Sequence, residues 1–285
     1  MLIKMRRNNN VKTSDAFEYE IVRMVSNHIG EELPLMLPHW LKEEGVRPGA
    51  KILNVDGIGS KDRRNKTDVI IYLENSMPIK ISAKLMNADY FGNWYGHKRF
   101  LQEFGEEAFY RMTKASTDFA NNWSKTAIAP FVGVSICFGR RSGRTGQDFT
   151  DIFTVDDILT VARGYGSGDR VANCMYIANH SASSIPDLIN SLDEISTTSV
   201  IAATESFKVA HRPINPITEG TNRGKNVYTR FMPFKALPEK TIITSPKTLF
   251  SLGQFVTIQP NCLNHNHILD DLEENYNIII PRKPR

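Results

Sequence analysis

An acid, a hydroxyl and an amine lie at spacings that bring them to one end of a predicted β-hairpin. Asp68 directly precedes an apolar, β-branched run, and Ser82 and Lys84 close a second run in which apolar and polar residues alternate. Because side chains two residues apart leave the same face of a strand, Ser82 and Lys84 share a face. A carboxylate and an ammonium at one end of a hairpin have the chemistry to hold a metal ion and an attacking water beside a phosphate.

These residues resemble the PD-(D/E)XK nuclease motif, above all the form found in type II restriction endonucleases. In that family the first Asp opens one strand and (D/E)-x-K closes the next, which matches Asp68 and Ser82-Ala83-Lys84. Thr67 stands in the place of the motif's proline, and Ser82 in the place of the second carboxylate. Both substitutions occur within the family. A similarity to the HaeIII type lies in Ala16-Phe17-Glu18-Tyr19 and in the Ser-x-Lys triplet.

The resemblance implies a role for each motif residue. Asp68 would be the essential ligand of a Mg²⁺ ion, and the main-chain carbonyl of Ala83 would be a further ligand. Lys84 would orient or help to deprotonate the attacking water and would stabilise the developing negative charge. Ser82 would bind only weakly or through a water, which leaves an acid position open and favours a one-metal mechanism.

Glu18 is the first candidate for that open position. It lies in a helix that the sequence predicts from Thr13 or Ser14 onward, in which apolar residues recur at helical spacing. A first-turn carboxylate is also favoured by the helix dipole alone. Many members of the resembled family, however, bring a Glu from an N-terminal helix to the metal. Asp56 and Glu74 are the less favoured alternatives.

Basic residues gather near the motif and in two later segments. One is the loop before Asp68, the second mixes aromatic and basic residues after Lys84, and the third is a Gly-rich turn that follows an apolar segment at 127–138. Arginine is well suited to bidentate contacts with phosphate and guanine. The alternative is a solvated turn, or a place in the core for the aromatic residues. The candidate DNA-binding residues are Lys61, Arg63, Arg64, Lys66, Lys98, Arg99, Arg140, Arg141 and Arg144.

Other motifs are weaker. His97 could act as a general base, although most histidines do not. Cys262, His265 and His267 lack a fourth ligand at zinc-site spacing. The cluster at 164–169 follows no strand and opens no clear helix, so it is not a dinucleotide fingerprint.

Composition is that of an ordinary globular protein, with 41% hydrophobic and 23% charged residues and a net charge of +4. Three well-separated cysteines argue against a disulfide framework, and no apolar run approaches the ~20 residues that span a bilayer. We expect one restriction-endonuclease-like domain over residues 1–285. It would consist of a flexible basic arm at 1–12, a catalytic core at 13–165, and a C-terminal elaboration at 166–285 for DNA recognition or dimerisation.

The expected fold is α/β, with a mixed central β-sheet flanked by helices and β-rich C-terminal elements. The expected function is that of a cytoplasmic, Mg²⁺-dependent type II restriction endonuclease that cuts double-stranded DNA as a homodimer, with a cognate DNA methyltransferase as companion and no membrane partner. Another PD-(D/E)XK nuclease, for repair or a particular DNA structure, is one alternative. The other is a non-catalytic nucleic-acid-binding protein in which Asp68 and Lys84 form a structural ion pair.

Overall fold

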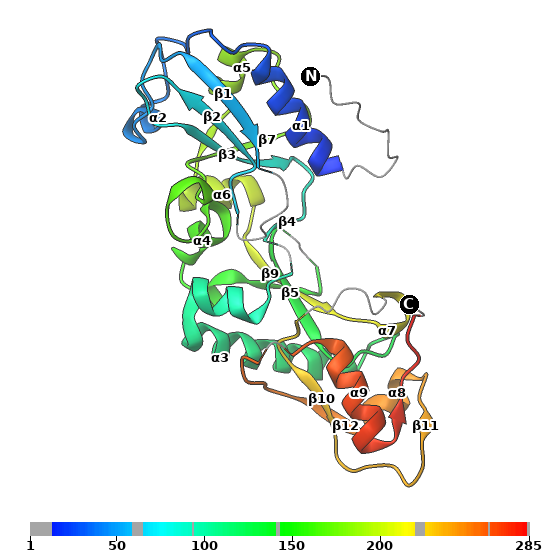
Figure 1. Cartoon of the computed structure of the whole chain (residues 1–285). Coiled ribbons are helices and arrows are strands. Elements are labelled where there is room, and N and C mark those ends of the chain that lie inside the picture. The colour runs from blue at the N-terminus through cyan, green and yellow to red at the C-terminus, as the bar shows by residue number, and fades with distance from the viewer. Residues whose placement is uncertain are drawn as a thin grey trace. The chain divides into compact units, whose positions relative to one another are not determined.

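The computed structural model describes residues 13–58, 65–92, 94–140, 143–219, 226–261 and 263–283. The chain divides into two compact units, each built from two segments (Figure 1). The first unit takes in residues 1–88 and 158–203, and the second 89–157 and 204–285. The expectation of one domain with a catalytic core at 13–165 stays a prediction. The expected basic arm at 1–12 lies outside the described residues.

The first unit contains a five-stranded mixed sheet of order β1-β2-β3-β7-β8. Its strands are β1 (Ile52–Gly57), β2 (Val69–Leu73), β3 (Ile79–Leu85), β7 (Cys174–Ala178) and β8 (Asp193–Glu194). Neighbouring strands are antiparallel except for β3 and β7, which run parallel. The hairpin of β2 and β3 confirms the prediction, and the turn between its strands holds Asn75 at a φ of 51°.

Helices accompany this sheet, and the longest of them, α1, packs on it through a shared core. They are α1 (Thr13–Ser26), α2 (His39–Glu43), α4 (Asp157–Arg163), α5 (Ile185–Asn190) and α6 (Thr197–Thr204), with a 3₁₀ turn at Gly168–Arg170. Phe17 and Ile21 of α1 share a buried cluster with Ile71 and Ile81. Because side chains alternate along a strand, the even-numbered positions of β3, Ser82 and Lys84 among them, point to the opposite face.

The second unit contains a four-stranded antiparallel sheet of order β4-β5-β9-β6 and two smaller strand pairs. The four strands are β4 (Tyr90–Gly92), β5 (Val134–Gly139), β9 (Lys208–Pro213) and β6 (Gly146–Asp148). The pairs join β10 (Arg230–Pro233) to β12 (Gly253–Val256) and β11 (Thr241–Ile242) to β13 (Ile278–Ile279). The helical elements are α3 (His97–Ser124), a 3₁₀ turn at Phe149–Asp151, α7 (Pro216–Glu219), α8 (Pro246–Ser251) and α9 (His265–Tyr276).

The whole is a mixed α/β structure with a mixed sheet flanked by helices. The C-terminal part is not simply β-rich as we expected, because α7, α8 and α9 alternate with its short strands. Among the described residues, none of the helices combines the length and the apolar character that crossing a membrane requires.

Candidate active site

The motif lies where β1, β2 and β3 come together at one end of the hairpin. The backbone N–H of Asp68 donates to the carbonyl of Ile81 (2.8 Å), and the carbonyl of Asp68 accepts from the N–H of Ile58 (3.0 Å). Asp68 is therefore held on both sides by main-chain hydrogen bonds just before β2 begins. Its side-chain position is set by strand pairing rather than by a flexible loop.

The carboxylate of Asp68 contacts two residues of the Ser82-Ala83-Lys84 triplet, Ala83 and Lys84. Its Oδ2 accepts a hydrogen bond from the backbone N–H of Ala83 (2.8 Å) and another from Nζ of Lys84 (3.0 Å). The same Nζ donates to the carbonyl oxygen of Ala83 (2.8 Å). The side chains of Asp68 and Lys84 are 21% and 18% exposed, so this pair is only partly solvated. Ser82, next to them on β3, is buried.

Glu18 of α1 is electrostatically coupled to this pair. The pKa of Glu18 is raised from 4.5 to about 7. Burial is the largest cause of the rise and the negative charge of Asp68 adds to it, while the positive charge of Lys84 opposes it. The structure thus brings Glu18 into the neighbourhood of Asp68 and Lys84. A carboxyl group that is half protonated near neutral pH is the kind of group often found at functional sites.

Glu74 and Asp56, the two alternatives for the open acid position, differ in where they lie relative to Asp68. Glu74 follows the last residue of β2, at the opposite end of the strand from Asp68. Six residues of extended chain separate them by about 20 Å, so Glu74 cannot share a site with Asp68. Asp56 lies on β1 opposite Ile70, where it is exposed and accepts a weak hydrogen bond from Asn54 (3.4 Å). Asp56 is not among the charges that shift the pKa of Glu18.

The oxygen atoms at this end of the hairpin are of the kind that a hard divalent cation binds. Asp68 Oδ2 and the Ala83 carbonyl oxygen lie within 3.0 Å and 2.8 Å of one nitrogen, and Glu18 supplies a further carboxylate nearby. Mg²⁺ prefers oxygen ligands and keeps several waters, so few protein ligands suffice. Within the part of the chain that the structure describes, no group of three or more His, Cys, Asp and Glu residues forms a ready metal site.

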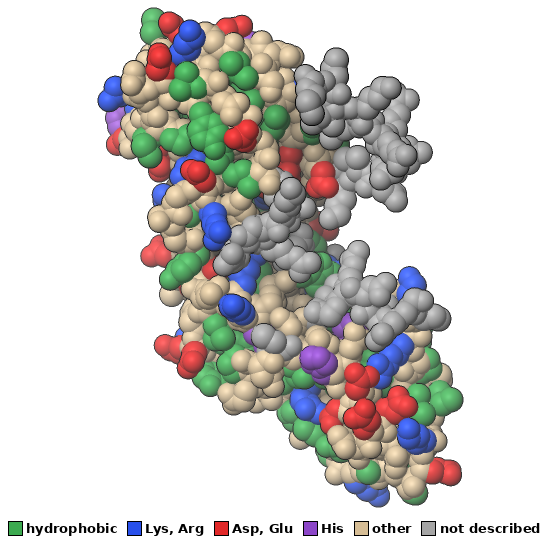
Figure 2. Space-filling view, in the orientation of Figure 1, with side chains coloured by type: hydrophobic (Ala, Val, Ile, Leu, Met, Phe, Trp, Pro, Cys, Tyr) green, Lys and Arg blue, Asp and Glu red, His purple; other side chains and the backbone are tan. Residues whose placement is uncertain are grey.

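The candidate DNA-binding residues have varied environments. Lys61, Arg63, Arg64 and Arg141 lie outside the described residues. Lys66 is buried and Lys98 is exposed. Arg99 is paired with Glu103 (2.6 Å) and donates to the hydroxyl of Tyr95 (2.8 Å), so its guanidinium is occupied inside the second unit. On the face seen in Figure 2, Lys and Arg side chains are interspersed with Asp and Glu over the described surface.

The Gly-rich turn after β5 contributes two arginines of opposite character. Arg144 is exposed, lies 5.0 Å from the ring centroid of Trp123 and donates to Thr126. Arg140 is half-buried, and its Nε and Nη2 atoms have no hydrogen-bond partner within the described residues. Among the candidates that the structure describes, Arg140 is therefore one with unmet donors.

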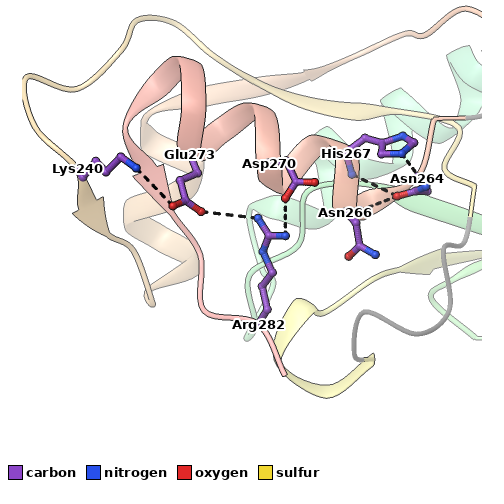
Figure 3. Close-up of polar contacts among 7 residues, drawn as sticks. All are labelled: Lys240, Asn264, Asn266, His267, Asp270, Glu273 and Arg282. Atoms are coloured by element: carbon purple, nitrogen blue, oxygen red, sulfur yellow. Dashed lines mark hydrogen bonds and ion pairs between the residues drawn. The ribbon is translucent and has the colours of Figure 1, made fainter. Parts of the chain in front are cut away.

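The histidines and cysteine of other motifs have structural surroundings. His97 is fully buried, its Nε2 hydrogen-bonds the carbonyl of Val227 (2.7 Å), and burial lowers its pKa, so it is a core residue rather than a general base. His265 is also buried. His267 lies at the start of α9, where Asn264 caps the helix and contacts the imidazole (Figure 3). Cys262 lies outside the described residues.

No match to this chain was found among protein-family models, curated proteins or solved structures.

The sequence did not indicate one part of this site. The backbone N–H of Ala83 donates to Asp68, and this contact depends on how β2 and β3 pair.

The Gly-rich loop at 164–169, which is no nucleotide-binding fingerprint, packs against the same hairpin: Lys80 Nζ donates to the carbonyl of Gly168 (2.9 Å). Lys66 N–H donates to the carbonyl of Arg170 (3.1 Å). No local signal could have placed that loop, because it is about ninety residues from β3 in sequence.

Proposed function

We propose that this protein is a Mg²⁺-dependent endonuclease that hydrolyses phosphodiester bonds in double-stranded DNA, as type II restriction enzymes do. The observation that carries the proposal is the contact of one Asp68 oxygen with both Ala83 and Lys84 at the end of the hairpin. Asp68 and Lys84 stand at the positions of the motif's acid and lysine, and each touches the other. The mixed sheet flanked by helices is compatible with the expected restriction-endonuclease-like fold.

The chemistry follows from these groups. A bound Mg²⁺ supplies charge relief at the scissile phosphate and polarises a water. Asp68, the Ala83 carbonyl and Glu18 would hold that ion. Lys84 places a positive charge beside the developing negative charge and orients the attacking water through its ammonium. Ser82 is buried and carries no charge, so it contributes at most a hydroxyl.

The wider proposal includes a short specific DNA site, a homodimer and a cytoplasmic setting with a companion DNA methyltransferase. Symmetric half-sites in DNA match symmetric subunits, which is why a palindromic target goes with a two-fold dimer. A repair or structure-specific nuclease shares the same site chemistry and differs in sequence preference.

A binding protein without catalysis is the second candidate. The Asp68–Lys84 contact itself favours it, because a closed, partly buried ion pair is also what a structural role requires. Ser82 in place of an acid points the same way. This candidate predicts DNA binding that does not depend on Mg²⁺ and no cleavage.

Incubation of the purified protein with phage DNA, in Mg²⁺ or in EDTA, tests the proposal. We expect discrete DNA fragments only with Mg²⁺, and we expect Lys84→Ala and Asp68→Asn to lose at least a hundredfold in rate, as is usual when a group acting on proton transfer is removed. Lys80→Ala is the matched control, since Lys80 lies on the same strand and contacts Gly168 instead. A metal-independent mobility shift with intact DNA would identify the binding protein instead.

A further inference from the structure

The ammonium of Lys84 contacts two of the three groups that the proposed function assigns to a metal, Asp68 and the Ala83 carbonyl. Its Nζ is 3.0 Å from Asp68 Oδ2 and 2.8 Å from the carbonyl oxygen of Ala83. We infer that Lys84 is a built-in competitor for the metal, so that a divalent cation binds Asp68 and Ala83 only when Lys84 moves away. The inference rests on the proposed function for the identity of the two ligands.

Asp68 Oδ2 already makes two hydrogen bonds. It accepts from the Ala83 backbone N–H and from Lys84, which occupies both of its lone pairs. The N–H of Ala83 belongs to β3, which is paired on both sides by β2 and β7 and so cannot turn away. Lys84 is joined to the backbone by a flexible four-carbon chain. When a cation approaches Oδ2, Lys84 is therefore the donor that leaves.

Charge adds to this competition. An ammonium and a divalent cation on the same two oxygens repel each other, and the repulsion is strong because the Asp68 and Lys84 side chains are about four-fifths buried. The metal-free site is thus neutralised by its own lysine. The first cost of metal binding is the loss of the contacts of Lys84 with Asp68 and Ala83.

A DNA phosphate offers Lys84 a new anionic partner. Charge-assisted hydrogen bonds to phosphate are strong, so the ammonium that leaves Asp68 is stabilised when a phosphodiester lies beside it. DNA and metal consequently help each other to bind. Because coupling is reciprocal, DNA raises the affinity for metal by the same factor by which metal raises the affinity for DNA.

Calorimetric titration of the full chain with Mg²⁺ alone measures the competition without any need for cleavage. We expect Lys84→Met to bind Mg²⁺ about tenfold more tightly than the wild type, as follows from removing one nearby positive charge. Lys84→Gln, which keeps a polar side chain, should show the same direction, and thermal melting reports whether either variant is folded. Lys80→Met, on the same face of β3, should bind Mg²⁺ as the wild type does.

A second titration uses Ca²⁺ with and without sheared phage DNA. We expect DNA to tighten Ca²⁺ binding severalfold in the wild type and by a smaller factor in Lys84→Met. Equal or weaker Mg²⁺ binding by both Lys84 variants overturns the inference, even if the wild type cuts DNA. If none of the proteins binds Mg²⁺ and none cuts DNA, the proposed function fails as well.

Discussion

The carboxyl group of Glu18 lies in surroundings that disfavour its charged form. Burial, followed by the charge of Asp68, raises its pKa from 4.5 to about 7. A raised carboxyl pKa means that the folded state holds a proton that the unfolded state releases between these two values. The free energy of unfolding therefore falls as pH rises from about 4.5 to about 7. Above that range Glu18 causes no further change in it.

Glu18→Gln should consequently stabilise the protein in EDTA at pH 8 and have little effect at pH 4.5. The full shift is reduced by partial solvent exposure, so we expect a gain of about 1–2 kcal/mol, or several degrees in Tm. Thermal melting at both pH values measures it, with Glu20→Gln as the control, because Glu20 is an exposed residue of the same helix. A gain of equal size at pH 4.5 and pH 8 would contradict the assigned cause.

For single residues, the sequence predicted a contact only where the spacing of the residues along the strands determines it. Alternation along β3 and the place of Asp68 before β2 predicted that Asp68 and Lys84 meet, and they do. The burial of Ser82 and the raised pKa of Glu18 depend on what α1 and the neighbouring strands exclude from water. Such exclusion is tertiary and has no signal in the local pattern.

Arg140 follows the last residue of β5, with its main-chain N–H bonded to the carbonyl of Asp89 (3.0 Å). Its buried Nε and Nη2 lack partners among the described residues, whereas Arg99, Arg111 and Arg230 are paired with carboxylates. A guanidinium edge with two unmet donors has the geometry for two oxygens of one phosphate, but both nitrogens are buried, so a phosphate reaches them only when the surrounding residues move. Under the proposed function, Arg140 at the end of β5 is a candidate contact for DNA.

We expect Arg140→Met to weaken binding of phage DNA in EDTA about tenfold. The slope of log affinity against log salt concentration should also decrease by the contribution of about one phosphate contact. The thermal stability should not fall, because the substitution removes two buried donors that have no partner among the described residues. Fluorescence anisotropy over a range of salt concentrations makes the measurement, and Arg23→Met, at an exposed site on α1, is the control. Unchanged affinity would show that the unmet donors are not used for DNA.

Elements with strong local patterns were predicted well. The hairpin and α1 follow the predictions from the sequence, and the apolar segment at 127–138 contains the start of β5. Residues 152–155 lead into α4, where Thr154 and Asp157 cap the helix with reciprocal hydrogen bonds (2.8 Å and 3.3 Å). The parallel pairing of β3 with β7 was missed, since it joins segments far apart in sequence.

Each unit of the molecule has its own buried core. One cluster joins α1 and α2 to the five-stranded sheet, and another joins β5, the β10–β12 pair and α9. Ion pairs of Arg282 with Asp270 and Glu273 fasten the last described residues to α9 within the second unit (Figure 3). Separate cores give each unit its own source of stability.

Scanning calorimetry should therefore give a calorimetric enthalpy larger than the van't Hoff enthalpy, the sign of more than one unfolding step. Leu41→Ala should lower one transition and Leu272→Ala the other, each by the roughly 2–5 kcal/mol typical of a buried leucine. Both leucines are fully buried, one in each core. A single transition with equal enthalpies, shifted alike by both substitutions, would contradict independent cores.

The insertion of the second unit's first segment between β3 and β7 has a consequence for synthesis on the ribosome. Residues 89–157 emerge after β3 and before β7, so β3 waits as an edge strand with open hydrogen-bonding groups. Such edges invite pairing with other nascent chains. Lys80 and Lys84 project from that strand, and lysine on an edge opposes such pairing. Lys84, the lysine of the proposed active site, would thus also oppose mispairing of the growing chain.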